Sequence, residues 1–269
     1  PKEDKKPKED KKPKEDKPIT YDLKKPYTID ILEQEIKELN DKPKKSKQEK
    51  KILSELTKIK ALTEIQFEVL PLKLKKVLQF NLISSYSTTP FDIADDMSKY
   101  ILSKINKKSS ESDKFSITDA TACIGGNTIS FGKFFSEVQS IEYEEFNYKI
   151  LEHNVEVSTS EELKKLYEPP VTGSIKVYLG SYEDIVPKIS ITDAIFFDPP
   201  WVEDGQTYNK KNPVVPKLGD KTIFEVIDNM CEKYKHVFVK LPVNLFRSSH
   251  IEGIDTKQFE YKKYKKMIL

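Results

Sequence analysis

Apolar residues in the N-terminal third of the chain recur at helical spacing. Within residues 27–41 they form a stripe from Ile31 to Leu39, because side chains three and four positions apart lie on the same face of a helix. A second stripe predicts a helix over about residues 46–63, and a shorter apolar and basic segment follows it. We therefore expect residues 27–80 to form a helical extension that packs against the rest of the chain.

From residue 116 onward the pattern changes to short, continuous apolar runs separated by helical stretches. The runs read SITDATACI, EVQSIEY, SIKVYLG, DAIFFD and HVFVKLP. Strands that are apolar on both faces and alternate with helices are typical of a doubly wound, mostly parallel sheet. We predict an α/β domain of this kind over residues 81–269, with one or two edge strands in the closing KQFEYKKYKKMIL.

The first 17 residues carry no apolar side chain. They repeat PKEDKK, and such a segment has nothing to bury that would offset the entropy lost on ordering. We expect residues 1–26 to be a disordered charged tail that acts as a solvated spacer. Docking of this tail to an RNA or protein partner is the alternative.

The charge of the chain excludes a general electrostatic attraction to nucleic acid. Lys and Arg number 46 against 44 Asp and Glu, and residues 1–17 account for the whole net charge of +2. The remaining 38 basic and 38 acidic residues balance. Binding to RNA must therefore come from local patches.

The sequence predicts neither a membrane segment, nor a disulfide framework, nor a metal. No apolar run approaches the roughly 20 residues that cross a bilayer. Cys123 and Cys231 are the only cysteines, which favours a reducing intracellular compartment, the cytoplasm or the nucleus, and is compatible with a viral protein in a host cell. The histidines have no metal-ligand spacing with the cysteines or with one another.

Polar residues and glycines stand at the predicted carboxyl ends of the strands, where ligands bind to doubly wound sheets. Asp119 and the pair Gly125 and Gly126 follow the first run, and Glu142 follows the second. The glycines let the backbone turn beside a ligand, and the carboxylate of Glu142 suits the two hydroxyls of a ribose. Since neither GxGxxG nor GxxxxGK[ST] occurs, a pyrophosphate ligand is disfavoured. We predict S-adenosylmethionine as cofactor, with its ammonium at Asp119.

The fourth run leads into DPPW, which holds the only tryptophan of the chain. Pro199 and Pro200 remove two backbone donors and fix φ, so Asp198 and the Pro199 carbonyl can both accept hydrogen bonds from the planar amine of a base. Trp201 offers a face on which that base stacks, worth roughly 1–3 kcal/mol. These four residues are the predicted catalytic set for methyl transfer to an exocyclic amine, in which alignment matters more than acid–base chemistry.

Both motifs together resemble the trimethylguanosine synthase family, which methylates N2 of the guanosine in a 7-methylguanosine RNA cap. DATACIGGNTISF is similar to that family's D-A-F-C-G-x-G-G-N-T-I-x-F stretch, and YSTTPFDIADDMSKYI is similar to the segment ahead of it. DPPW is similar to the S-P-P-W turn, and IFEVIDNMCEKYKHVFVKLPVN to the last helix and strand. The resemblance covers about residues 80–245 and implies a class I, Rossmann-like methyltransferase domain after a helical extension.

The resemblance also implies a set of contacts. Those to S-adenosylmethionine would come from Thr89, Asp119, Cys123, Gly125, Gly126, Asn127, Thr128, Glu142, Tyr143, Ser181 and Asp198. Trp201 would stack on the methylated guanine, whose positive charge adds a cation–π attraction that ordinary guanine lacks. The other candidate contacts to a capped RNA are Tyr208, Lys210, Lys211, Asn244 and Arg247.

Departures from the family pattern leave two other functions open. Ile124 replaces the first loop glycine, Ser181 replaces an aspartate that binds the adenine amine, and Val202 with Glu203 replaces a Gly-Gly pair. Asp198 stands where the family generally has Ser and is more similar to adenine-N6 methyltransferases, which carry D-P-P-W or N-P-P-Y. Methylation of adenine N6 or another nucleobase amine is therefore one alternative, and a non-catalytic module that binds RNA or a protein is the other.

Overall fold

The computed structural model describes residues 25–106, 114–201, 214–243, 245, 260, 262–264 and 267–269. The predictions for the tail up to residue 24 and for Tyr208, Lys210, Lys211, Asn244 and Arg247 lie outside these residues. Within them, no helix is long and apolar enough to cross a membrane.

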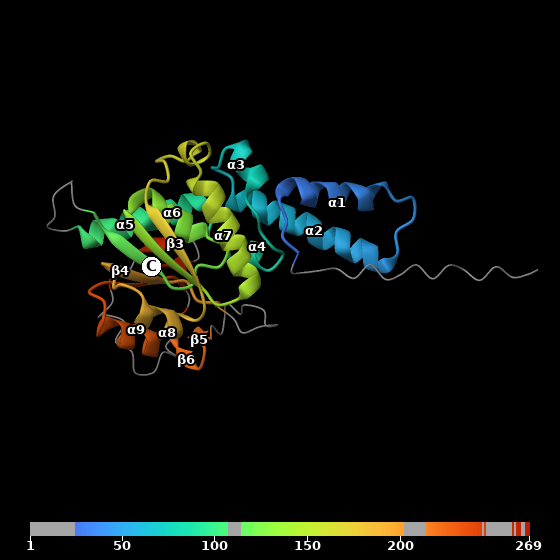
Figure 1. The fold of residues 1–269 in the computed structure, drawn as a ribbon. Helices are drawn as coiled ribbons and strands as arrows, with labels where there is room; N and C mark the ends of the chain where they lie inside the picture. The colour runs from blue at the N-terminus through green and yellow to red at the C-terminus, as the bar shows by residue number, and fades with distance from the viewer. Residues whose placement is uncertain are drawn as a thin grey trace, which may run out of the picture.

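The predicted α/β fold is confirmed, and its five central strands are all parallel (Figure 1). They are β1 (Ser116–Asp119), β2 (Glu137–Glu142), β3 (Ser174–Leu179), β4 (Ala194–Phe197) and β7 (Val237–Val239). Their order in the sheet is β3-β2-β1-β4-β7. The chain thus adds strands on one side of β1 and then on the other, so the strand order reverses between β1 and β4.

Helices cover both faces of this sheet. One face carries α5 (Phe91–Ile105), α6 (Gly126–Phe134) and α7 (Glu145–Thr159), and the other carries α8 (Tyr182–Ile185) and α9 (Ile223–Cys231). Short 3-10 turns lie at Lys164–Leu166 (η1) and Val186–Lys188 (η2).

Strand β4 shows why its sequence is apolar at every position. The Phe196 ring contacts Phe131 of α6 with centroids 5.2 Å apart, whereas the Phe197 ring contacts Tyr182 of α8 at 5.4 Å. Successive side chains of a strand point to opposite faces, so both faces of β4 are buried.

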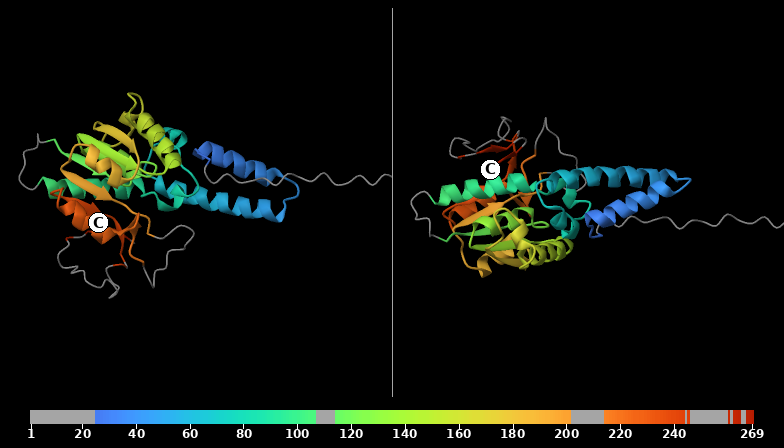
Figure 2. Two further views of the ribbon diagram at one scale, coloured as in Figure 1. Left: turned by 60° about the horizontal axis from the view of Figure 1, so that its bottom comes forward. Right: turned by 90° about the horizontal axis from the view of Figure 1, so that it is seen from above.

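The predicted helices in the N-terminal third are also confirmed. Helix α1 (Ile29–Asp41) and helix α2 (Lys47–Gln66) form an antiparallel hairpin that projects from the sheet (Figure 2), followed by α3 (Leu72–Val77) and α4 (Ser84–Ser87). Leu74 and Leu78 pack in one apolar cluster with Ile124 and Ile150 of the α/β part.

Two features differ from the expectation. Helix α5 was not predicted from periodicity. The closing segment does contain two short strands, β9 (Lys263–Tyr264) and β10 (Met267–Ile268), but the prediction that they extend the main sheet is wrong. They pair with β8 (Leu241–Pro242) in a separate antiparallel sheet, because the chain leaves β7 after three residues. A further small hairpin joins β5 (Lys217–Leu218) and β6 (Lys221–Thr222).

Candidate active site

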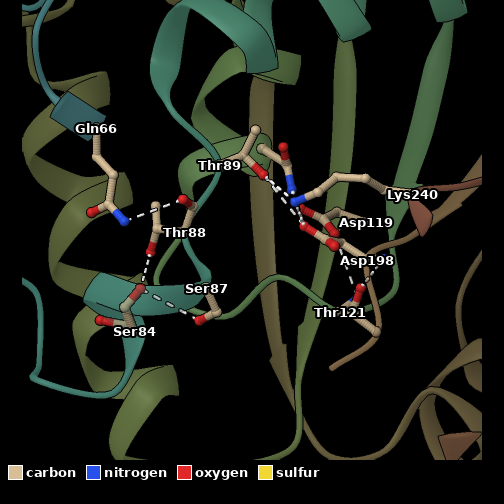
Figure 3. Close-up of polar contacts among 10 residues, drawn as sticks. Gln66, Ser84, Ser87, Thr88, Thr89, Asp119, Thr121, Asp198 and Lys240 are labelled. Carbon is tan, nitrogen blue, oxygen red and sulfur yellow. Dashed lines mark hydrogen bonds and ion pairs between the residues drawn. The ribbon is translucent and has the colours of Figure 1, made fainter. Parts of the chain in front are cut away.

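Asp198 lies directly after β4 and is the centre of a polar cluster at the switch in strand order. Its Oδ2 accepts hydrogen bonds from the hydroxyl of Thr89 at 3.3 Å and from Nδ2 of Asn127 at 3.3 Å, and it forms an ion pair with Lys240 (Figure 3). None of the described residues donates a hydrogen bond to the other carboxylate oxygen, Oδ1. Within the described part of the chain, one oxygen is therefore fixed by the protein and the other is left for a ligand.

Lys240 reaches this cluster from the adjacent strand end. Its backbone N–H donates to the Phe197 carbonyl at 2.8 Å, which places it beside Asp198. The side chain is only 3% exposed, and its Nζ donates to the hydroxyl of Thr89 at 2.6 Å. The same Nζ lies 5.6 Å from the centroid of the Trp201 ring.

Thr89 is brought here by the segment that follows the helical extension. Nε2 of Gln66, the last residue of α2, donates to the backbone carbonyl of Thr88 at 3.2 Å (Figure 3) and also to that of Ser85 at 2.6 Å. These buried bonds attach residues 85–88 to the end of α2. Thr89 follows directly and precedes Pro90, which caps helix α5. The extension thus positions a residue of the site.

Asp119 ends β1 and is fully buried. Its carboxylate accepts hydrogen bonds from the hydroxyl of Thr128 at 2.7 Å and from the backbone N–H of Thr121 at 3.4 Å. Burial raises its pKa from 3.8 to about 7, against the opposing effect of these hydrogen bonds. A cationic group placed beside Asp119 would therefore be needed to stabilise its charge fully at neutral pH.

The glycine turn leads into helix α6 in the conformation that only glycine adopts easily. Gly125 has φ of 98°, in the left-handed region, and a Cβ on Gly126 would lie 3.0 Å from Cγ2 of Thr88. Asn127, at the start of the helix, has a buried Oδ1 with no hydrogen-bond partner among the described residues. A buried acceptor of this kind requires a donor, and the ammonium of an amino-acid tail supplies one.

Glu142 ends β2 and ties the turn to the neighbouring strand. Its two oxygens accept hydrogen bonds from the backbone N–H groups of Cys123 at 2.8 Å and Glu144 at 2.9 Å. Each oxygen retains a second lone pair for a ligand hydroxyl. Tyr143 is 73% exposed beside it. Burial raises the pKa of the Cys123 thiol to about 12, so this cysteine is no nucleophile at neutral pH.

Ser181, after β3, has a carboxylate next to it in space. Its hydroxyl donates to Oδ2 of Asp184 at 2.7 Å and accepts from the Asp184 backbone N–H at 3.2 Å. A carboxylate therefore lies next to Ser181, in the first turn of α8.

The structure brings most of the candidate residues to one edge of the sheet. Thr89, Asn127 and Trp201 are linked through Asp198 and Lys240, and Asp119 is hydrogen-bonded to Thr128. Glu142 and Ser181 lie at the ends of the two strands beyond β1. Sequence reasoning did not assign Thr121 and Asp184 to the site, and it considered Lys240 only as a contact to a triphosphate bridge or as a solvated residue. The predicted run HVFVKLP includes Lys240, whereas in the structure β7 ends at Val239 and Lys240 directly follows it at the same edge.

Comparison with known proteins gives a family match over the α/β part. Residues 114–254 match the model of a family described as RNA cap guanine-N2 methyltransferase. Uncharacterized protein L320 of Acanthamoeba polyphaga mimivirus is 31% identical over 135 residues, which are 49% of this chain and 47% of the relative. The chain thus spans about half the length of the curated relative that it matches.

Solved structures resemble the chain more loosely. The N-terminal domain of human METTL16 in complex with SAH has a TM-score of 0.42 at 15% identity, covering 67% of this chain and 68% of that one. An rRNA methylase from Streptococcus thermophilus has a TM-score of 0.39 at 13% identity, covering 64% and 90%.

Proposed function

The chain belongs to the RNA cap guanine-N2 methyltransferase family, and on that premise we propose that it methylates the exocyclic N2 amine of 7-methylguanosine in an RNA cap. S-adenosylmethionine is the methyl donor. When bound, it supplies an electrophilic methyl group on a sulfonium. Everything else in the reaction is binding and orientation by the residues of this chain.

The residues at the ends of β1 and β2 fit this cofactor. The unpartnered Oδ1 of Asn127 and the buried carboxylate of Asp119 suit an ammonium group, and the glycine turn leaves room where a Cβ would collide. Glu142 has lone pairs for the ribose hydroxyls. Tyr143 offers an exposed ring to the adenine, and the Asp184 carboxylate, held by Ser181, can accept from the adenine amine.

The observation that carries the proposal is the open Oδ1 of Asp198 with Trp201 three residues further along. A carboxylate oxygen and the Pro199 carbonyl together accept both hydrogens of a planar amine, which directs its lone pair toward the methyl group. Trp201 gives the base a stacking surface, and a cationic 7-methylguanine gains additional attraction to the indole ring. The amine that accepts the methyl group would become positively charged, and the carboxylate of Asp198 would stabilise that charge until the amine loses its proton to solvent.

One observation favours a second candidate, the methylation of adenine N6. The Lys240 ammonium already lies 5.6 Å from the centroid of the Trp201 ring, and a second cation at the same ring is repelled by it. A neutral base such as adenine does not meet this repulsion, and its N6 amine can bind Asp198 in the same way.

Methyl transfer from labelled S-adenosylmethionine decides between these functions. The purified chain is incubated with 7-methyl-GTP, GTP, or adenine-containing DNA, and label in each acceptor is counted. We expect label in 7-methyl-GTP and much less in GTP. Label in adenine DNA alone would establish the second candidate, and label in no acceptor together with no heat of cofactor binding would favour a non-catalytic binding module.

A further inference from the structure

Lys240 has a buried ammonium group to which the proposed methyl transfer assigns no role. A lysine that is 3% exposed is rare in proteins, because burying its charge costs more free energy than most packing returns. Its ion pair with Asp198 and its hydrogen bond to Thr89 compensate for this cost. Both partners belong to the site, so the lysine acts at the place where the base binds.

We propose that Lys240 is a positioning residue that holds Asp198 by one oxygen and, through its charge at Trp201, sets which bases are accepted. The inference rests on the proposed function only in requiring that an amine-bearing base binds between Asp198 and Trp201. It does not depend on which base this is.

The geometry explains the positioning. The donors to Oδ2 of Asp198 come from Thr89, Asn127 and Lys240, which lie on three separate elements of the fold. Donors fixed on different elements prevent rotation of the carboxylate plane. The hydrogen bond from Lys240 to the Thr89 hydroxyl, 2.6 Å long, leaves that hydroxyl hydrogen pointing to Asp198. Oδ1 consequently faces the site in one orientation.

The charge explains the selectivity. Asp198 and Lys240 together contribute no net charge, so an amine is recognised by hydrogen bonding and not by attraction to an isolated carboxylate. If Lys240 were replaced by a neutral residue, Asp198 would be a largely buried anion without its cationic partner, and the ring of Trp201 would lose a neighbouring cation. Both changes favour a cationic base over a neutral one.

The test uses Lys240→Met, which keeps the length of the side chain without its charge, and Lys240→Arg, which keeps the charge. Lys133→Met is the matched control. Lys133 is 4% exposed and forms an ion pair with Asp95 between α6 and α5, so its replacement also breaks a buried ion pair, but away from the site. A structural role alone predicts the same behaviour for Lys240→Met and Lys133→Met.

Base binding can be followed without turnover, since Trp201 is the only tryptophan and its fluorescence reports directly on stacking. Each variant is titrated with 7-methyl-GTP, GTP and ATP. In Lys240→Met we expect the affinity for 7-methyl-GTP relative to the neutral nucleotides to rise about threefold or more, the size of an exposed cation–π contribution. Lys240→Arg and Lys133→Met should keep the ratio of the unaltered protein.

Turnover is then measured on whichever acceptor the unaltered protein methylates. We expect Lys240→Met to lower kcat about tenfold or more, as for the loss of a charge-assisted hydrogen bond, with little change in cofactor KM. Lys240→Arg should recover part of kcat. An unchanged affinity ratio in Lys240→Met, or equal losses of kcat in Lys240→Met and Lys133→Met, would overturn the inference. Failure of the cap proposal would be seen separately, as the absence of label in 7-methyl-GTP with the unaltered protein.

Discussion

The hydroxyl oxygen of Thr121 accepts a hydrogen bond from the backbone N–H of Asp198 at 2.6 Å. This bond joins the loop after β1 to the loop after β4, across the switch in strand order. The backbone N–H of Thr121 donates in turn to Asp119 at 3.4 Å. One residue thus connects the predicted cofactor side of the site with the predicted base side.

Replacing Thr121 with Val should reduce turnover. The substitution leaves the partly buried Asp198 N–H without its acceptor, which costs about 1 kcal/mol and allows Asp198 to shift. We expect kcat to fall about tenfold with cofactor affinity largely kept. Thr121→Ser retains the acceptor and should stay near the unaltered rate. Steady-state kinetics of both variants provide the check. Equal kcat values for Thr121→Val and Thr121→Ser would show that the hydrogen bond to the Asp198 N–H does not affect turnover.

Trp201→Ala should abolish methyl transfer, because the base loses its stacking surface next to Asp198. Stacking of one base is worth about 1–3 kcal/mol, and misalignment of the amine adds to the loss. Binding of S-adenosylmethionine, measured by calorimetry, should survive. Trp201→Phe keeps an aromatic face and should retain part of the activity. Unchanged turnover in Trp201→Ala would exclude the stacking role.

Asp184→Ala should weaken cofactor binding, since it removes the carboxylate that Ser181 holds beside the predicted adenine position. Loss of one hydrogen bond to a charged group predicts about a tenfold rise in Kd. Glu183→Ala is the neighbouring control, because Glu183 pairs instead with Lys221 on the surface. Calorimetric titration with S-adenosylmethionine measures the Kd of both variants. Equal Kd values for Asp184→Ala and Glu183→Ala would contradict a contact between Asp184 and the cofactor.

Asp119 should make stability depend on pH in an unusual direction. Burial raises the pKa of this carboxyl from 3.8 to about 7, so its contribution to stability is fully present below pH 3.8 and is lost as the pH rises through about 7. Burial also raises the pKa of Glu142, which adds an effect of the same sign. Thermal unfolding without cofactor should therefore show a steeper loss of stability between about pH 4 and about pH 7 than Asp119→Asn shows. If the stability of the unaltered protein and of Asp119→Asn declined equally with pH, the raised pKa of Asp119 would be contradicted.

The sequence was sufficient for the sheet and for the edge at which the polar residues gather. Buried strands are continuous apolar runs, and whatever follows each run lies at the carboxyl edge, so Asp119, Glu142 and Asp198 could be placed together without coordinates. Helix α5 was not predicted, although its sequence carried the signal: its buried residues Ile93, Met97 and Ile101 recur at every fourth position on one face.

The partners of these residues could not be predicted. Whether Lys240 is solvated or buried depends on β7 lying beside β4, which is a fact of strand order and not of local pattern. Likewise, Asp184 reaches Ser181 only because the chain turns into α8 immediately after β3. Substitution of one residue in a family motif was visible in the sequence, whereas the contact of Ser181 with the Asp184 carboxylate was not.

Methylation of the exocyclic N2 amine of 7-methylguanosine is tested most directly by identifying the atom that receives the methyl group. Product from 7-methyl-GTP and S-adenosylmethionine is digested to the nucleoside and analysed by fragmentation mass spectrometry, with Trp201→Ala as the inactive control. We expect an added methyl on the exocyclic N2 amine, which gives N2,7-dimethylguanosine or its further methylated form. A methyl group found only on adenine N6, or an N2 product that Trp201→Ala forms equally well, would contradict it.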